Sequence, residues 1–487
     1  MSAAPRRALA WTALAASCYL LYLHNLAAVG LLGPDEPRYA SIARSMARSG
    51  DWLTPRLWGE AWFEKPPLLY WMSAAGFAAG LGEDLAPRLS VALVAIGFLL
   101  LYWRVLAREF GKRAALLATA ILGTSAAWIG LGHVAVTDMP LAAAFSAAML
   151  LCLPWMARGE RRLLPAAAAL SGLAVLSKGL VPLVLALPLF WAGRARWRDL
   201  LRPAPAAAFL LVAAPWYVAM TAVHGRRFLD DFFVTQHFSR FASDALQHVQ
   251  PFWFYVPVII AGLFPWSPLL ALLFRRPLYK DVRAQFLLLW LVFGFVFFSA
   301  AANKLPGYLL PLLPAASALI GVALASSSRA SWLVAVCAAL LGLVPVVADV
   351  LPQALLSGIT HAGVKAGWPA VAIGSGLGLA AWMLLRRGRE DTAVLVVAAG
   401  TVAAVLWLQA ATYPALDRSV SARGLWRELA ARRDVACVGE VNRGWRYNLN
   451  YYSVTPLPDC RTTPGVLRIE QRPGEPPYLA AASLSAF

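Results

Sequence analysis

Apolar stretches long enough to cross a lipid bilayer recur along this chain from residue 8 to residue 412. A helix needs about 20 mainly apolar residues to span the hydrocarbon core, and inside lipid every backbone N–H and C=O must be paired within the protein. With 60% hydrophobic and only 14% charged residues, the chain has far too much apolar material for one soluble core. The sequence therefore predicts an all-α protein that crosses the membrane many times.

The positively charged residues orient these spans. A net charge of +18 is compatible with nucleic-acid binding, but the Lys and Arg residues cluster in every second short loop between the apolar stretches, and thus all on one side. Loops of that kind face the cytoplasm, so we expect a cytoplasmic N-terminus, an outer C-terminus and no nucleic-acid partner. The first apolar stretch is long for a signal peptide and is interpreted as a retained span. We predict thirteen spans, at residues 8–32, 88–107, 114–132, 140–156, 163–177, 180–193, 204–222, 252–274, 284–302, 306–325, 331–350, 368–385 and 392–412.

Three outer segments are longer than simple turns and give the expected domain organisation. Residues 1–412 form the transmembrane core, with outer loops at 33–87 and 223–251. Residues 413–487 form a small soluble C-terminal domain, since the strand-like DVACVGEV and the Pro-rich end that follows it suggest an α/β appendage. Long ordered loops usually carry function, so the active residues are expected on the outer side.

The first outer loop contains two apolar or amphipathic pieces. In PRYASIARSMARSG, Tyr39 and Ile42 fall on one helical face and Arg44 and Arg48 on another, which predicts a helix lying in the membrane interface. Residues 66–80 are apolar but too short to span comfortably, so we expect them to dock along the membrane or re-enter it.

Two cysteines lie in the soluble tail. Cys437 and Cys460 would be in an oxidising compartment, where a disulfide could close the loop between them. The alternative is that both are free thiols, because sequence alone does not show whether their Cα atoms come close enough. Cys18, Cys152 and Cys337 fall within apolar spans and are expected to be buried small side chains.

Acidic residues at the starts of outer helices are candidates for catalysis. Asp35 and Glu36 precede the amphipathic helix, where the helix dipole and free amides keep a carboxylate ionised, which suits a base, a metal ligand or an electrostatic stabiliser. Asp138 lies at the outer end of the fourth span. The alternative for Asp35 and Asp138 is a structural helix cap.

The outer loops also offer groups for a phosphate or a metal ion. Glu64 and Lys65 stand side by side before two prolines, and Lys65 is placed to meet a lipid phosphate; the alternative is a snorkelling Lys paired with Glu64. His237 and Arg240 are three residues apart, on one face if helical. Such histidines are usually structural, but with carboxylates they could bind a metal. Because the chain has no Gly-rich phosphate loop and the outer face has no nucleotide sugars, no nucleotide is expected and a donor must arrive through lipid.

The chain resembles the lipid-carrier-dependent glycosyltransferases of the aminoarabinose transferase type, relatives of the protein O-mannosyltransferases in the C-type superfamily. The resemblance covers nearly the whole chain, and its most specific parts are GPDEPRYASIARSM, FEKPPLLYW, TDMPL, LSKGL, QHFSRF and NKLPGYLLPLLP. It departs at Gln236, where an acidic residue is expected, and at Trp58, which replaces a polar residue. These departures bear on the sugar and the acceptor.

The resemblance implies a function and a set of site residues. It implies an inverting glycosyltransferase in the bacterial inner membrane, with an outer cavity, an undecaprenyl-phosphate sugar donor and lipid A or another envelope glycolipid as acceptor. Asp35 and Asp138, with Glu36 beside them, would be the acidic residues of the site, and Lys65 and Arg240 would hold the carrier phosphate. Glu64 and His237 would bind a divalent metal such as zinc, weakly held. The cavity would be lined by Tyr39, His248, Lys304 and Tyr308.

Other functions remain open from sequence. The same chemistry could use a protein or a surface glycan as acceptor. A secondary transporter is a different class, but it usually shows paired repeats that this chain lacks. A lipid flippase or lipid-binding module would need Lys65 and Arg240 to bind the phosphate, but would not need the acidic residues Asp35 and Asp138. We expect a monomer whose only other partners are membrane lipids.

Overall fold

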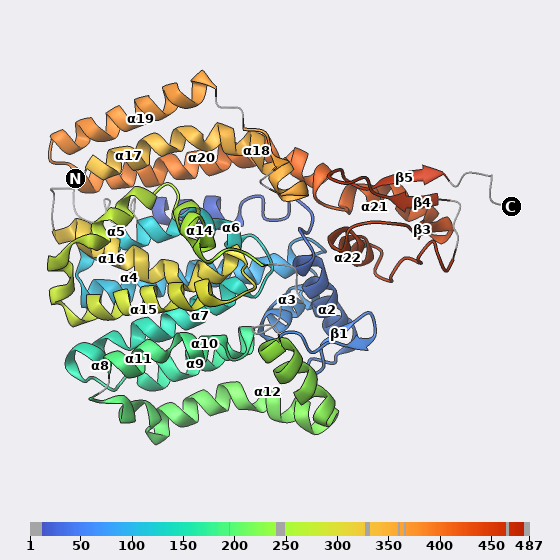
Figure 1. Cartoon of the computed structure of the whole chain (residues 1–487), viewed down its shortest axis with the longest axis horizontal. Helices are drawn as coiled ribbons and strands as arrows, with labels where there is room; N and C mark the ends of the chain where they lie inside the picture. Colours follow the sequence, from blue (N-terminus) through green and yellow to red (C-terminus); the bar gives the residue numbers. More distant parts are fainter. Residues whose placement is uncertain are drawn as a thin grey trace.

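The structure is a computed structural model that describes residues 12–193, 195–239, 249–326, 332–358, 361–364, 367–463 and 467–481. Most of these residues are helical, and the apolar helices run side by side, with a smaller domain projecting from one end of the bundle (Figure 1). The predicted all-α multi-pass membrane protein with a small α/β appendage is therefore confirmed.

The apolar helices match the predicted spans in position. Within the described residues, eight are long enough to cross a membrane by length and composition. They are α4 (Ala86–Glu109), α7 with α8 (Asp138–Arg158), α12 with the start of η3 (Pro203–Val234), α15 (Val282–Ala300), η7 with α16 (Pro306–Ser326), α17 to α18 (Trp332–Ser357), α19 (Trp368–Arg386) and α20 (Glu390–Ser419).

The remaining predicted spans fall on bent or shorter helices. Two pairs are bent by 60° and 114°, namely α5 (Lys112–Gly123) with α6 (Ala126–Gly132) and η4–α14 (Phe252–Gly262) with η5 (Ser267–Phe274). Shorter apolar helices cover Thr12–Leu23, α9 (Leu164–Lys178) and α10–α11 (Val181–Ala192). Length and composition alone give eight to ten spans, so the count of thirteen stays a prediction.

The first outer loop packs more deeply than expected. It forms α2 (Asp35–Ser49), a hairpin of β1 (Arg56–Leu57) and β2 (Glu60–Ala61), and α3 (Leu68–Ala78). The α2 helix packs against α3 and α22 (Arg443–Tyr452), so it is buried on two sides, and its position in the membrane interface stays a prediction. Arg44, predicted to face away from the apolar side, is buried because it donates to the Tyr451 carbonyl and lies over the Tyr451 ring.

The soluble domain follows α20 without a flexible break. It consists of α21 (Arg423–Leu429), η10 (Ala430–Val435), α22 and a sheet in the order β3 (Ala436–Val438), β4 (Leu467–Glu470), β5 (Tyr478–Ala481), with β3 and β4 parallel and β4 and β5 antiparallel. The α20 helix continues to Ser419, past the domain boundary expected at residue 412. A disulfide joins Cys437 in β3 to Cys460, whose Cα atoms are 4.9 Å apart.

Polar contacts fix this domain against the first outer loop. Arg423 pairs with Asp84 at 2.8 Å, and the Tyr452 hydroxyl donates to the same carboxylate at 2.7 Å. The Asn448 side chain donates to the Leu31 carbonyl at 2.6 Å. In Figure 1 the red domain accordingly lies beside the blue α2 and α3 at one end of the helices. The contacts place α22 directly over the helix that carries the acidic candidates.

Candidate active site

Four charged side chains of the first outer loop form a chain of ion pairs. Asp35 begins α2 and accepts a hydrogen bond of 2.5 Å from Arg38, one turn later. Arg38 also lies 3.1 Å from Glu64, and Glu64 lies 3.4 Å from Lys65. Arg38 and Glu64 are buried, whereas the Asp35 side chain is 40% exposed. Asp35 is thus a carboxylate held in place on one side and open on the other.

Aromatic rings surround the guanidinium of Arg38. Its Cζ lies 5.4 Å from the ring centroids of Tyr39, Trp62 and Tyr447. Burial alone would lower the pKa of Arg38, but the negative charges of Glu64 and Asp35 outweigh it and raise the pKa above its ordinary value. The guanidinium therefore stays charged while it orients both carboxylates.

Tyr447 brings the soluble domain into this arrangement. It lies on α22, and its ring is 5.7 Å from the ring of Trp58, in the turn between β1 and β2. Trp58 has a φ of 52°, a left-handed conformation that turns usually assign to Asn or Gly. The residue noted in the sequence as a departure from the family pattern therefore makes a contact between the first loop and the soluble domain.

A second acidic centre lies at the start of α7. Asp138 accepts a hydrogen bond of 2.7 Å from Lys178, whose ammonium lies 4.4 Å from the Tyr308 ring centroid. Asp35 is also close enough to interact electrostatically with Lys178. Gly307 packs against the same carboxylate, since a Cβ there would lie 3.0 Å from Asp138 Oδ1. Lys178 is thus paired with Asp138 and also feels the negative charge of Asp35.

Glu36 has a structural position, in contrast to its neighbour Asp35. It is fully buried and accepts two hydrogen bonds of 2.7 Å from Arg88 of α4. It also accepts from the backbone N–H groups of Leu32 and Ala135. With its oxygens engaged in this way, Glu36 has no exposed oxygen to offer a substrate, so we assign it to positioning the loops and not to catalysis.

Of the predicted site residues in and next to the outer loop at 223–251, the structure describes the side chain of Lys304 only. Lys304 is buried, and its ammonium donates to the backbone carbonyls of Gln250 and Ala301, so it holds the end of the outer loop at 223–251 in place. Arg240 and His248 lie outside the described residues, and so does the side chain of His237.

The described residues do not form a metal site. No group of three or more His, Cys, Asp or Glu side chains converges among them. Glu64 is the one predicted ligand whose side chain is described, and its carboxylate already faces two cations, Arg38 and Lys65. A metal ion would compete with both cations for the Glu64 carboxylate, so the proposed reaction does not require one.

Sequence reasoning missed two cations of the site, Arg38 and Lys178. Lys178 ends α9, a short apolar helix, beside Gly179 in the LSKGL motif, and is assigned no role from the sequence. A lysine flanked by apolar helices is costly unless it is paired, which was the available signal. Nothing in the sequence indicated Tyr447, because its contact with Arg38 joins opposite ends of the chain.

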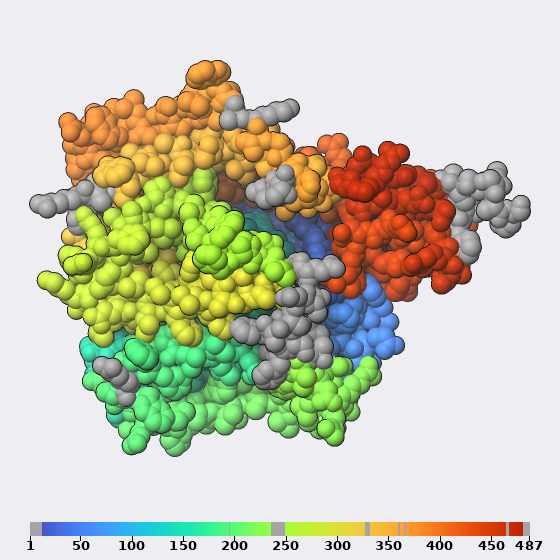
Figure 2. All heavy atoms as spheres, viewed as in Figure 1, coloured from blue at the N-terminus to red at the C-terminus, as the bar shows by residue number. Residues whose placement is uncertain are grey.

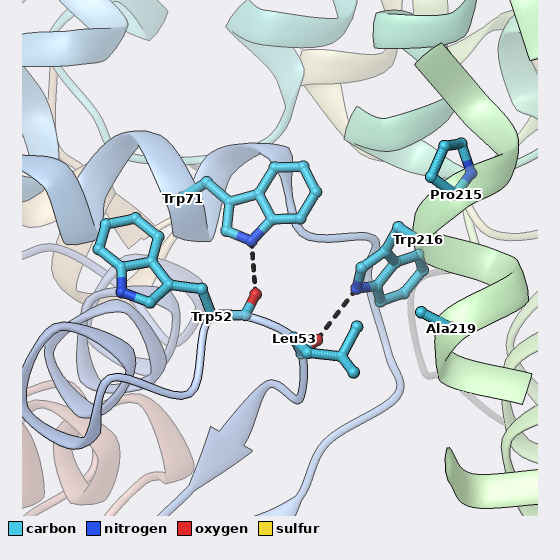
Figure 3. Close-up of a pocket in the computed structure, with 6 residues that line it drawn as sticks. All are labelled: Trp52, Leu53, Trp71, Pro215, Trp216 and Ala219. Atoms are coloured by element: carbon cyan, nitrogen blue, oxygen red, sulfur yellow. Dashed lines mark hydrogen bonds between the residues drawn. The ribbon is translucent and has the colours of Figure 1, made fainter. Parts of the chain in front are cut away.

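An apolar pocket lies beside the site, between the first outer loop and α12. Its volume is about 530 Å³, and it is lined by Trp52, Leu53, Trp71, Pro215, Trp216 and Ala219 (Figure 3). The indole N–H groups of Trp71 and Trp216 donate to the Trp52 and Leu53 carbonyls, which fixes the loop between α3 and α12. Trp216 belongs to an aromatic cluster that reaches Phe63, the residue before Glu64.

Comparisons with known proteins agree with this architecture. The family model for dolichyl-phosphate-mannose-protein mannosyltransferase matches residues 8–225. The chain superposes on the crystal structure of ArnT from Cupriavidus metallidurans bound to undecaprenyl phosphate with a TM-score of 0.75 and 26% identity, covering 98% of both chains. The apo structure of that protein gives a TM-score of 0.73, also at 26% identity, and covers 97% of this chain and 87% of that one.

Curated relatives carry the name undecaprenyl phosphate-alpha-4-amino-4-deoxy-L-arabinose arabinosyl transferase. The protein from Edwardsiella ictaluri is 35% identical over 62% of this chain, and the one from Pseudomonas aeruginosa strain UCBPP-PA14 is 36% identical over 66%. The chain spans only 57% and 60% of those two relatives. The relative from Serratia proteamaculans is 33% identical over 75% of this chain and 69% of its own length. On this identity and coverage, the chain belongs to the family of undecaprenyl phosphate-aminoarabinose arabinosyl transferases.

Proposed function

We propose that this protein transfers a sugar from an undecaprenyl-phosphate carrier to lipid A or another cell-envelope glycolipid at the outer face of the bacterial inner membrane. The observation that carries the proposal is the chain of ion pairs from Asp35 through Arg38 and Glu64 to Lys65, together with the pair of Asp138 and Lys178 at the start of α7. Two carboxylates held by cations suit sugar binding and proton transfer, and a partly exposed lysine suits a lipid phosphate.

The reaction we propose is a single displacement. An oxygen of the acceptor forms a bond to the anomeric carbon while the bond from that carbon to the carrier phosphate breaks, and the electron pair leaves with the phosphate. Lys65, whose side chain is 16% exposed, would neutralise the phosphate as its charge grows, together with Arg240. Stabilisation of that developing charge is usually the largest catalytic contribution.

The role of Asp35 depends on the acceptor. A hydroxyl acceptor loses a proton as it attacks, and the exposed oxygen of Asp35 would accept it. A phosphate acceptor is already anionic, so no base is needed and Asp35 would hold the sugar. Asp138, paired with Lys178 below Tyr308, would contact the sugar from the other side of the site.

The apolar pocket gives the carrier lipid a place beside the phosphate-binding residue. Trp71 lies on α3, which begins three residues after Lys65. The pocket lined by Trp52, Trp71 and Trp216 would receive the first part of the prenyl chain (Figure 3). Burying apolar surface there contributes roughly 25 cal/mol per Å².

The proposal includes an orientation. The N-terminus would be cytoplasmic and the C-terminus periplasmic, and the Cys437–Cys460 disulfide supports the second assignment because disulfides persist outside the cytoplasm. The protein would act as a monomer. A weakly held divalent metal at Glu64 and His237 remains an additional proposal that the reaction above does not require.

Mass spectrometry of envelope lipids tests the function. Lipid A and surface glycans from cells with and without this protein should differ by one sugar, which names both donor and acceptor. Cells expressing Asp35→Asn should show the same loss as the deletion while keeping wild-type amounts of protein in the inner membrane. Unchanged lipid A and glycans in the deletion strain would refute sugar transfer.

A further inference from the structure

Exposed arginines gather at the end of the helix bundle away from the soluble domain, and no step of the proposed reaction uses them. They lie in two turns, where α8 (Leu153–Arg158) leads into α9 and where η2 (Trp197–Leu201) leads into α12. Figure 1 shows α8 and α11 (Leu187–Ala192) at this end, and Figure 2 shows the teal and green atoms of this region on the surface, opposite the red soluble domain. The arginine patch consists of Arg161, Arg162, Arg198 and Arg202.

A buried carboxylate fixes two arginines of the patch. Asp199 of η2 is 6% exposed and lies 3.0 Å from Nε of Arg161 and 3.1 Å from Nε of Arg202. The indole N–H of Trp155 donates to the same carboxylate at 3.2 Å. About half of each arginine side chain nevertheless stays exposed, 51% for Arg161 and 54% for Arg202. Both guanidinium groups are therefore held in place and still open to a ligand.

The patch carries more positive charge than the carboxylates beside it balance. Asp199 serves Arg161 and Arg202 together. Arg162 and Arg198 are exposed and have no carboxylate partner within the part of the chain that the structure describes. All four cations are arginines, although membrane orientation needs only positive charge from Lys or Arg. A guanidinium differs from an ammonium in that its planar fork binds a phosphate through two N–H groups at once.

Exposed apolar side chains border the patch. Trp191, near the end of α11, is 71% exposed, and Leu201 is 61% exposed. The guanidinium of Arg198 lies 5.8 Å from the centroid of the Trp197 ring. Tryptophans gather where the hydrocarbon of a bilayer meets the head groups, and basic pockets between membrane helices at that level bind anionic lipid head groups. A molecule that matches the patch therefore has an anionic head group and apolar chains.

The two helices that leave the patch lead toward the candidate active site. The α9 helix begins two residues after Arg162 and ends at Lys178. The α12 helix begins directly after Arg202 and carries Trp216 of the apolar pocket. The two helices pack against each other, but only 17% of the most apolar part of α12 is buried within the protein. A lipid bound at the patch would add a contact to a helix that has little protein around it.

We propose that the arginine patch binds a phospholipid with two phosphates, such as cardiolipin, and that this lipid holds the beginnings of α9 and α12 together. One phosphate lies against Arg161 and Arg202, which come from the two different turns, and the other lies against Arg162 and Arg198. Four arginines beside one carboxylate suit two phosphates better than the single phosphate of phosphatidylglycerol. The inference does not rest on the proposed sugar transfer, because the patch lies at the other end of the helices.

Native mass spectrometry of the full chain tests the site. The protein in detergent would be titrated with cardiolipin, phosphatidylglycerol and phosphatidylcholine, and cardiolipin should bind most tightly. The double variant Arg162→Gln/Arg198→Gln should weaken cardiolipin binding by about 25-fold, at about fivefold for each arginine near an anionic head group. Both side chains are exposed, so the change leaves the fold intact. The matched control is Arg387→Gln, an exposed arginine between α19 and α20 outside the patch, which should bind cardiolipin as the wild type does.

A charge-retaining variant separates a built site from a general attraction between charges. Arg162→Lys/Arg198→Lys keeps both positive charges but loses the forks, so it should bind cardiolipin several-fold more weakly than the wild type. Cardiolipin should also raise the melting temperature of the wild type, because it binds the folded protein, and this rise should be absent in Arg162→Gln/Arg198→Gln.

The remaining outcomes decide between this lipid and other occupants. Wild-type cardiolipin affinity in either double variant would overturn the proposal, and so would an equal loss in Arg387→Gln. Equal binding of cardiolipin and phosphatidylglycerol would show that the patch does not recognise two phosphates. Undecaprenyl phosphate should bind Arg162→Gln/Arg198→Gln as it binds the wild type, and a loss there would make the patch a carrier site instead. Failure of the cardiolipin measurements would leave the proposed sugar transfer untouched, since none of its residues is changed.

Discussion

Removing the buried Glu36–Arg88 pair should destabilise the protein more than ion-pair replacement usually does. Deleting one partner of a buried pair leaves an uncompensated charge and costs about 3–5 kcal/mol, whereas replacing both partners by apolar residues is often neutral. Here both side chains also bind backbone. Glu36 accepts from two N–H groups, those of Leu32 and Ala135. Arg88 donates to three carbonyls, those of Leu26, Val29 and Gly30.

The magnitude follows from those five backbone groups. Each buried polar group left without a partner costs about 1–3 kcal/mol. Arg88→Met should therefore lower the free energy of unfolding by at least about 3 kcal/mol. The double variant Glu36→Leu/Arg88→Met should lose about 5 kcal/mol or more, since it leaves all five groups unpaired instead of restoring stability.

Thermal unfolding in detergent, followed by intrinsic tryptophan fluorescence, measures this effect. The control is Arg113→Met, which breaks the ion pairs of the half-exposed Arg113 side chain with Asp391 and Glu390 and should cost no more than about 1 kcal/mol. A double variant as stable as the wild type would show that the backbone contacts do not matter and that the pair is replaceable.

Four further changes test the site and the soluble domain. Asp35→Asn should abolish sugar transfer, measured by lipid A mass spectrometry, and full transfer in this variant would remove Asp35 from the mechanism. Its stability should change by about 1 kcal/mol or less, because a partly exposed carboxylate at a helix start contributes little to folding. Gly307→Ala should reduce transfer by displacing the Asp138 carboxylate, which a Cβ would approach to 3.0 Å, and normal transfer would show that the carboxylate has room to move. In non-reducing buffer, Cys437→Ser should be less stable than the wild type by about 3 kcal/mol, and after reduction the two proteins should be equally stable. Equal melting temperatures of variant and wild type before reduction would contradict the stabilising role of the disulfide. Tyr447→Phe should leave transfer unchanged, since it keeps the ring beside Arg38. Tyr447→Leu should lower the maximal rate of transfer without unfolding the protein, and equal rates in the two variants would show that the ring does not position Arg38.

Features that depend on local composition were predictable from sequence. The apolar helices follow from runs of apolar residues, and the start of α2 at Asp35 follows from the acidic residues and proline of GPDEP. The Cys437–Cys460 pairing was accessible because they are the two cysteines of the tail and the other three lie in apolar spans. That Asp35, Asp138 and Lys65 make ion pairs was also predictable, because charged residues next to a bilayer are costly unless they are used or paired.

Features that depend on distant contacts were not predictable. Asp35 and Glu36 are adjacent and look equivalent in sequence, yet one is exposed to the site and the other is buried against Arg88. What separates them is the direction in which each side chain leaves the helix, which depends on where α4 packs. Arg44 was placed on a polar face for the same reason, because the periodicity of α2 does not show that α22 covers it.

The contact between Arg38 and Tyr447 gives the soluble domain a part in the chemistry. Arg38 orients both Asp35 and Glu64, and one of the three rings that enclose its guanidinium comes from α22. The same helix carries Arg443, whose guanidinium lies 6.0 Å from the centroid of the Tyr447 ring. A shift of α22 would therefore move a ring that packs on Arg38, the residue that orients Asp35.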